Sequence, residues 1–147
     1  MKQMTKSKLA IRIVLVVGCL YAAAWLLFLR DTPERVASKV DRCVQDANAA
    51  CAWAYVPEDE KKTMSVSQQQ FARLLKEYVA PTLNSLGEPK SRTLKPSIIP
   101  GSYELKRDYT SGDGEPRTIS LIAVPGPDGP VVPGLLSGLV TQTMSLR

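Results

Sequence analysis

Apolar residues along the chain form one long run and then several shorter, periodic stretches. The long run extends from Leu9 to Leu29 and is interrupted by a single charge, Arg12. At about 1.5 Å of rise per residue, a helix of this length measures roughly 31 Å, enough to cross a hydrocarbon layer of about 30 Å. Arg12 and Arg30 lie near its two ends, where their side chains can reach the interfaces. The pattern predicts a transmembrane anchor over residues 9–30, with the lipid bilayer as a partner.

Two other kinds of N-terminal segment, a cleaved signal peptide and a lipoprotein signal, also contain an apolar run. A cleaved signal peptide has a shorter apolar region and a small-residue cleavage site, whereas here the apolar character continues to Leu29. The sequence VVGC, ending at Cys19, resembles a bacterial lipobox, in which the cysteine would carry a lipid. We favour an uncleaved anchor, because a further ten almost wholly apolar residues follow the cysteine. Whether Cys19 is lipidated stays open.

A first helical stretch follows the anchor. Thr32, Pro33 and Glu34 form a helix start, with Thr32 as the N-cap and proline at the first helical position. Small apolar residues then keep helical spacing to about Tyr55, and Pro57 ends the stretch. These residues are Val36, Val40, Cys43, Val44, Ala47, Ala50, Cys51 and Ala54. The spacing predicts one continuous amphipathic helix over residues 32–55.

The two cysteines of this helix lie eight residues apart. On a continuous helix their Cα atoms would be about 12 Å apart, beyond the limit of about 7 Å for a disulfide. We therefore expect Cys43 and Cys51 to be free and buried. A disulfide between them would require a break in the helix near Asn48.

A charged connector over Glu58–Lys62 is expected to lead into a second helix. Ser67 and Gln70 have the spacing of a capping box, and Val66 and Phe71 that of a hydrophobic staple. Apolar residues then occupy one helical face. They are Phe71, Leu74, Leu75, Tyr78 and Val79. Pro81 is expected to break or kink the helix, which ends at Gly87.

Beyond Gly87 the apolar period changes from 3.6 to 2, and prolines punctuate the chain. Residues 90–96 form a weak strand candidate, and residues 103–109 and 117–124 are predicted to form an antiparallel hairpin around a Gly-rich turn. Val131 and Val132 fit a short last strand. Residues 134–144 fit either a short helix or a strand, and their two glycines argue against the helix.

The excess of basic residues lies at the N-terminal end of the chain and not in the domain that follows. The chain has nineteen basic and fourteen acidic residues, a net charge of +5, but five basic residues and no acidic ones precede Asp31. The remainder is electrically balanced, which argues against nucleic acid as a partner. Four basic residues precede the uncharged apolar stretch over residues 13–29. The positive-inside bias therefore predicts a cytoplasmic N-terminus over residues 1–8, an anchor in the cell membrane (plasma or inner membrane), and an extracytoplasmic domain over residues 31–147. Gly18 and Ala22 form a small-xxx-small pair through which two anchors could pack as a homodimer.

Residues that could carry chemistry are few. The chain has no histidine, which excludes serine–histidine and cysteine–histidine pairs, a histidine base and histidine metal ligands. Two cysteines outside the anchor are too few for a structural zinc site, and the carboxylates are scattered. We assign no catalytic residue, metal or cofactor, and the balance is against an enzyme.

The order of anchor, long helix, connector, second helix and antiparallel strands resembles the cystatin-like or NTF2-like α+β fold. The resemblance covers about residues 32–144 and concerns element order only. It implies two helices packed on a curved antiparallel sheet of three to four strands. Members of that fold serve as enzymes, ligand-binding cones and assembly modules, and membrane-anchored proteins of similar layout include periplasmic domains of bacterial secretion machines. No functional residue can be carried over from element order alone.

Two functions are compatible with these observations. We favour a protein-interaction or assembly module, which needs only a folded domain with a usable surface. The alternative is a ligand-binding or weakly catalytic cone for a small apolar or anionic molecule. In that case Trp53, Phe71 and Tyr78 would enclose a pocket with the sheet, and Arg107 or Asp108 would supply a polar contact.

Strand alternation places Arg107 on one face with Tyr103, Leu105 and Tyr109. If that face is buried, the guanidinium needs an anionic partner, either a helix carboxylate or a ligand. We favour instead an edge position, where the guanidinium reaches water over its apolar stem. An enclosed pocket with Arg107 unpaired inside would favour the cone, and a filled core would favour the module.

Overall fold

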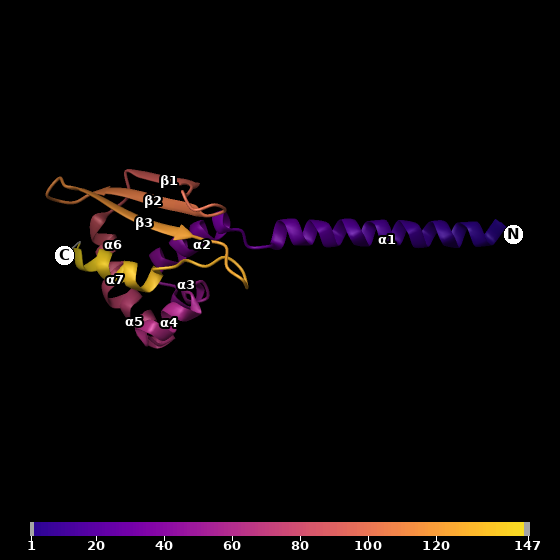
Figure 1. Ribbon diagram of the computed structural model, residues 1–147. Coiled ribbons are helices and arrows are strands. Elements are labelled where there is room, and N and C mark those ends of the chain that lie inside the picture. Colours follow the sequence, from indigo (N-terminus) through magenta and orange to yellow (C-terminus); the bar gives the residue numbers. More distant parts are fainter. Residues whose placement is uncertain (1, 146–147) are drawn as a thin grey trace. The chain divides into compact units, whose positions relative to one another are not determined.

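The computed structural model describes residues 2–145 and divides into two compact units, Met1–Asp31 and Thr32–Arg147. The first unit contains helix α1 (Lys2–Leu29), drawn in indigo in Figure 1. Its segment Ala10–Leu27 is long and apolar enough to cross a membrane, a test that signal sequences near an N-terminus also pass.

The second unit begins with α2 (Pro33–Gln45), and its start is as predicted. The Arg35 N–H donates to the Thr32 hydroxyl. The predicted continuous helix over residues 32–55 is wrong, because α2 ends at Gln45 and a separate helix, α3 (Ala49–Trp53), follows. At the break Ala47 has φ 51°, and the Asn48 side chain accepts a hydrogen bond from the Cys51 N–H. Asparagine thus caps a new helix instead of continuing the old one.

The break brings together the two cysteines that were expected to be free. Cys43 and Cys51 form a disulfide with their Cα atoms 5.9 Å apart. The expectation of free thiols is therefore wrong. The separation of about 12 Å applies only to an unbroken helix, and the turn between α2 and α3 shortens it. The break near Asn48 that a disulfide requires is present.

The segment expected to be a connector is a helix, α4 (Glu58–Met64). Its first turn holds three acidic residues and its last turn two lysines, which complements the helix dipole. The predicted capping box is confirmed, because Gln70 N–H donates to the Ser67 hydroxyl and Ser67 N–H donates to the Gln70 side chain. Three segments follow without a gap: α5 (Gln68–Leu74), the π-helical η1 (Leu75–Val79) and α6 (Ala80–Leu86).

Pro81 does not end this long helix. Proline has no N–H to donate and its ring crowds the carbonyl of the preceding turn. The π-helical turn directly before it widens the backbone, and helical geometry continues to Leu86. Gly87 then ends the helix at φ 72°.

Three antiparallel strands form one sheet in the order β1-β2-β3. They are β1 (Ser91–Pro96), β2 (Tyr103–Thr110) and β3 (Pro116–Ala123). The predicted hairpin of the last two is confirmed, with Arg107 opposite Ile119. The predicted strand at Val131–Val132 is reduced to a single bridge between Val124 and Val131.

The C-terminal segment is a helix, α7 (Leu135–Ser145). The glycines that argued against a helix are compatible with it. Gly134 lies before the helix at φ 72°, and only Gly138 lies within it. Glu60 of α4 holds its start, accepting hydrogen bonds from the N–H groups of Gly134, Leu136 and Ser137 at 2.9, 2.9 and 3.2 Å.

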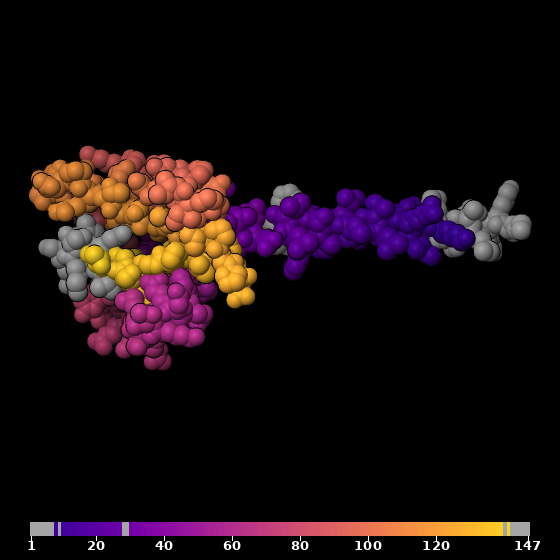
Figure 2. Space-filling model, viewed as in Figure 1, coloured from indigo at the N-terminus to yellow at the C-terminus, as the bar shows by residue number. Residues whose placement is uncertain are grey.

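The domain is of the α+β class, with the helices on one face of the sheet (Figure 1). It has more helices than the two predicted, because α3, α4 and α7 were not expected as separate helices. Residues from α2, η1, β2 and α7 meet in the core, among them Val36, Val40, Leu75, Leu105 and Leu136. In Figure 2 the described part of α7, in yellow, lies between the orange sheet and the magenta helices.

Candidate functional site

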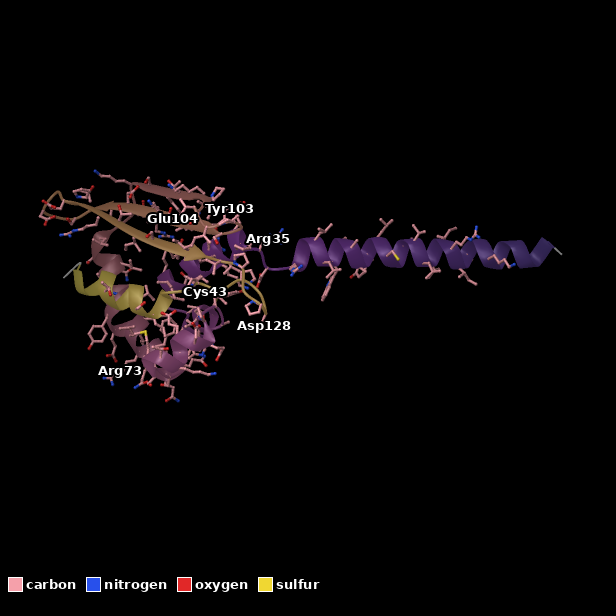
Figure 3. The ribbon with its side chains drawn as sticks, viewed as in Figure 1. Arg35, Cys43, Arg73, Tyr103, Glu104 and Asp128 are labelled. Carbon is pink, nitrogen blue, oxygen red and sulfur yellow. A yellow bond between two sulfur atoms is a disulfide. The ribbon has the colours of Figure 1, made fainter. Side chains whose placement is uncertain are left out.

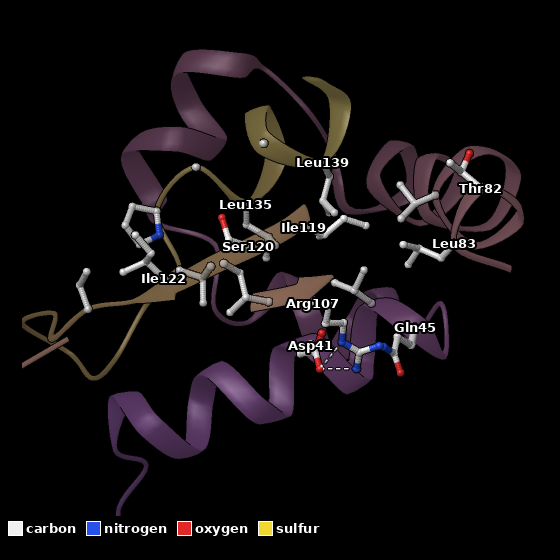
Figure 4. Close-up of a pocket in the computed structure, with 18 of the residues that line it drawn as sticks. Asp41, Gln45, Thr82, Leu83, Arg107, Ile119, Ser120, Ile122, Leu135 and Leu139 are labelled. Atoms are coloured by element: carbon white, nitrogen blue, oxygen red, sulfur yellow. Dashed lines mark hydrogen bonds and ion pairs between the residues drawn. The ribbon is translucent and has the colours of Figure 1, made fainter. Parts of the chain in front are cut away.

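A pocket of about 240 Å³ lies between the sheet and helices α2, α6 and α7 (Figure 4). Consecutive residues from Ile119 to Ile122 line it, so it lies along β3, an edge strand of the sheet. Most of its wall is apolar: α2 contributes Val44, α6 contributes Leu83, and α7 contributes Leu135, Gly138 and Leu139. The pocket can therefore enclose an apolar molecule.

The polar part of the wall is built around Arg107 on the central strand β2. Arg107 is only 9% exposed. Its Nε and Nη2 atoms both donate hydrogen bonds to Oδ2 of Asp41 on α2, at 3.1 and 2.5 Å (Figure 4). Nη1 donates a longer bond, 3.5 Å, to the Tyr109 hydroxyl. Arg92 on β1 donates to the same Asp41 oxygen at 3.4 Å. Two guanidinium groups thus share one carboxylate, which leaves the cluster with a net positive charge.

The position of Arg107 corrects one prediction and confirms the reasoning behind another. The favoured edge position is wrong, because β2 is the central strand and Arg107 is buried together with Leu105 and Tyr109. The strand alternation that placed these side chains on one face is confirmed. The anionic partner that burial required is a helix carboxylate, Asp41. The outcome lies between the two alternatives considered, since a pocket is present but its arginine is paired.

Three aromatic residues predicted to line the pocket lie elsewhere. Phe71 is fully buried, with its ring centroid 5.5 Å from that of Trp53 in the core near α3 and α5. The Lys61 Nζ lies 4.9 Å from the centroid of the Trp53 ring. Tyr78 is 43% exposed. Of the four residues predicted to bind a ligand, only Arg107 lines the pocket.

Asp108, the alternative polar contact, belongs to the opposite face of the sheet. Its carboxylate accepts hydrogen bonds from the hydroxyl groups of Ser91 and Thr118 on the two neighbouring strands, at 2.5 and 2.8 Å. These bonds, the one from Ser91 above all, lower the pKa of Asp108 below its ordinary value. It is a cross-strand contact and does not line the pocket.

Asp41 is the main pocket residue that sequence reasoning missed. It lies four residues after Ala37 and three before Val44, both buried, so it belongs to the apolar face of α2. An acidic residue at such a position indicates a buried cationic partner. The pattern was therefore visible, but nothing local indicated that Arg107, 66 residues away, was the partner.

Within residues 2–145 no group of three or more histidine, cysteine or acidic side chains is placed to hold a metal ion. No model of a known protein family matches the sequence. No curated protein matches it either. Among solved structures it is similar to one from Campylobacter jejuni, provisionally described as an NTF2-like transpeptidase, with a TM-score of 0.47 and 14% sequence identity over 70% of this chain and 98% of that one.

Proposed function

We propose that the protein is a membrane-anchored binding protein. Helix α1 holds the domain at the outer face of the membrane, and the pocket beside β3 binds a small, mostly apolar molecule with an anionic or hydrogen-bond-accepting end. The observation that carries this proposal is a largely apolar pocket with the buried Arg107–Asp41 pair in its wall. The interaction module favoured by the sequence requires only a filled core and an exposed surface, so it does not require such a pocket.

The size of the pocket limits the ligand. An apolar protein cavity of about 150 Å³ accepts benzene. A pocket of about 240 Å³ is therefore suited to two fused rings or an aliphatic chain of comparable volume. Because most of the wall is aliphatic, the favourable free energy of binding comes mainly from removing apolar surface of the ligand from water.

The polar end of the ligand is assigned from the guanidinium of Arg107. An arginine has five N–H donors, and its bonds to Asp41 and Tyr109 engage one hydrogen each on Nε, Nη2 and Nη1. An acceptor group of the ligand can accept a hydrogen bond from one of the remaining N–H groups of Arg107 without displacing Asp41. Arg92, the second guanidinium on Asp41, makes the surroundings positive, which favours a carboxylate over a neutral acceptor.

Two observations support the outer location. Four basic residues precede the uncharged apolar stretch over residues 13–29, as the positive-inside bias requires for a cytoplasmic N-terminus. The Cys43–Cys51 disulfide is typical of an oxidising compartment and is rare in the cytosol.

The test uses Gly138, which lies in α7 on the face that carries Leu135 and Leu139. Among the described residues, a Cβ built on Gly138 meets no atom within 4 Å beyond the backbone of its own helix, so a side chain there would extend into open space beside the pocket. Gly138→Leu should fill the pocket, whereas Gly138→Ala adds one methyl group and serves as the matched control. Both changes raise helix propensity, so neither should unfold the domain.

Binding of naphthalene-2-carboxylate to the full chain in lipid nanodiscs is measured by isothermal titration calorimetry, with empty nanodiscs as the blank. We expect binding to the wild-type chain and to Gly138→Ala, and its loss in Gly138→Leu. Heats equal to the blank for the wild-type chain, or unchanged binding to Gly138→Leu, would overturn the proposal.

A further inference from the structure

The loop between β1 and β2 exposes two adjacent isoleucines. Ile98 is 101% exposed and Ile99 is 46% exposed. The loop is nevertheless folded, because Ser97 N–H donates to the Ser102 carbonyl at 2.9 Å and Ser102 N–H donates to the Ile99 carbonyl at 3.1 Å. Ile98 therefore projects from a folded loop, while Ile99, which is half exposed, also lines the pocket beside β3.

This loop lies at the end of the domain where α2 begins. Figure 3 shows Arg35 in the first turn of α2, Tyr103 directly after the loop, and Asp128 at the same end. The loop also touches the segment that contains Asp128, since a Cβ on Gly101 would lie 3.3 Å from Pro125 Cγ. The turn between β2 and β3 lies at the opposite end of the sheet (Figure 1).

The chain itself limits how far this end can lie from a membrane that contains α1. Helix α1 ends at Leu29 and α2 begins at Pro33, so only residues 30–32 separate them. Three extended residues span at most about 11 Å. Resting on the proposed anchor, we infer that the tip formed by Ile98 and Ile99 inserts into the outer surface of the lipid bilayer.

A bilayer suits this tip because its side chains are apolar and the loop keeps its own fold. The isoleucine side chains gain by leaving water. The hydrogen bonds donated by Ser97 N–H and Ser102 N–H hold the shape of the loop. The short linker makes the bilayer the nearest large apolar surface outside the domain.

The test places a fluorescent label at the tip of the loop in the full chain. Ile98→Cys is made in a Cys19→Ser background and labelled with nitrobenzoxadiazole, while the Cys43–Cys51 disulfide stays oxidised and does not react. Gly112→Cys is the matched control, since Gly112 is exposed in the β2–β3 turn and a Cβ there meets no atom of the described part of the chain within 4 Å. Both proteins are reconstituted into phosphatidylcholine vesicles and exposed to lipid-attached nitroxide or aqueous iodide.

We expect the label at position 98 to lose fluorescence with the lipid nitroxide and to resist iodide, and the label at position 112 to behave in the opposite way. If position 98 is quenched by iodide as strongly as position 112, the membrane contact is overturned while the anchor stands. Resistance of position 98 to both quenchers would indicate a protein contact and would also overturn it. Failure of the chain to float with the vesicles would overturn the anchor itself, and the membrane contact with it.

Discussion

A buried pair of opposite charges joins the first helix of the domain to the central strand of its sheet. Removing two charged groups from water is costly, and their attraction repays this cost only while both partners are present. Arg107 donates to Asp41 through two nitrogens, and little of either residue is exposed. The burial of each charge is therefore favourable only while the other residue is present.

Asp41→Leu should destabilise the domain by about 3–5 kcal/mol, because it leaves the Arg107 guanidinium buried without its carboxylate. The double variant Asp41→Leu/Arg107→Met, which removes both charges, should recover most of this loss. Urea unfolding of the full chain in detergent, followed by near-ultraviolet circular dichroism, gives the free energies. A single variant as stable as the double variant would contradict the interpretation.

Asp108 makes the folding stability of the domain depend on pH at acidic pH. The hydroxyl groups of Ser91 and Thr118 lower the pKa of this carboxyl in the folded state, so the folded domain binds the proton less tightly than the unfolded chain. The resulting stabilisation is complete above the unfolded pKa of about 3.9 and is lost as the pH falls through the lower, folded pKa. The stability advantage of wild type over Asp108→Asn should therefore shrink between pH 6 and pH 2. Urea midpoints across this range test it, and an advantage that does not change with pH would refute it.

At the scale of elements, α7 depends on a carboxylate from a distant helix. The first N–H groups of any helix lack partners within it. Those of α7 donate to Glu60, whose negative charge also complements the positive end of the helix dipole. Because α7 lines the pocket, this contact supports a wall of the candidate site.

Glu60→Ala should cost about 1–2 kcal/mol of stability, since it removes a helix cap. Hydrogen exchange at the amides of Gly134, Leu136 and Ser137 should accelerate before that of the sheet does. Asp59→Ala is the matched control, because Asp59 is the exposed neighbour in α4. Equal exchange in both variants would show that Glu60 does not hold the helix.

The disulfide between α2 and α3 should stabilise the domain by about 2–3 kcal/mol, as expected for a short closed loop. Adding a reductant should lower the thermal midpoint of the wild-type chain and leave that of Cys43→Ala/Cys51→Ala unchanged. Mass spectrometry of the unreduced protein should find the two cysteines bridged. If the reductant does not change the wild-type midpoint, the disulfide contributes no stability.

The elements that the sequence predicted well are those specified by neighbouring residues. The capping box of Ser67 and Gln70 and the alternation around Arg107 are local patterns, and both are present. The elements that sequence reasoning missed depend on residues far apart in the chain. One example is α7, whose first N–H groups are bound by Glu60. Another is the burial of Arg107, which depends on its ion pair with Asp41. The pocket itself requires α2, η1, α6, β2, β3 and α7 to be assembled, so no single stretch of sequence contains its pattern.

At the scale of the whole molecule, the asymmetry of charge around the apolar run predicts the orientation of the protein. A reporter that is active only outside the cytoplasm, fused after Arg147, should be active, because the positive-inside bias predicts that the basic N-terminal end stays in the cytoplasm. The same reporter fused before Met1 should be inactive. Activity confined to the N-terminal fusion would reverse the assigned orientation.

The short disulfide loop also affects how the protein matures. Synthesis begins at the N-terminus, so Cys43 and Cys51 are made before any strand of the sheet. Beyond the apolar run the chain contains no other thiol with which either could pair. An oxidant alone can therefore form the correct bond while the rest of the domain is still being made, and no isomerase is needed to correct it.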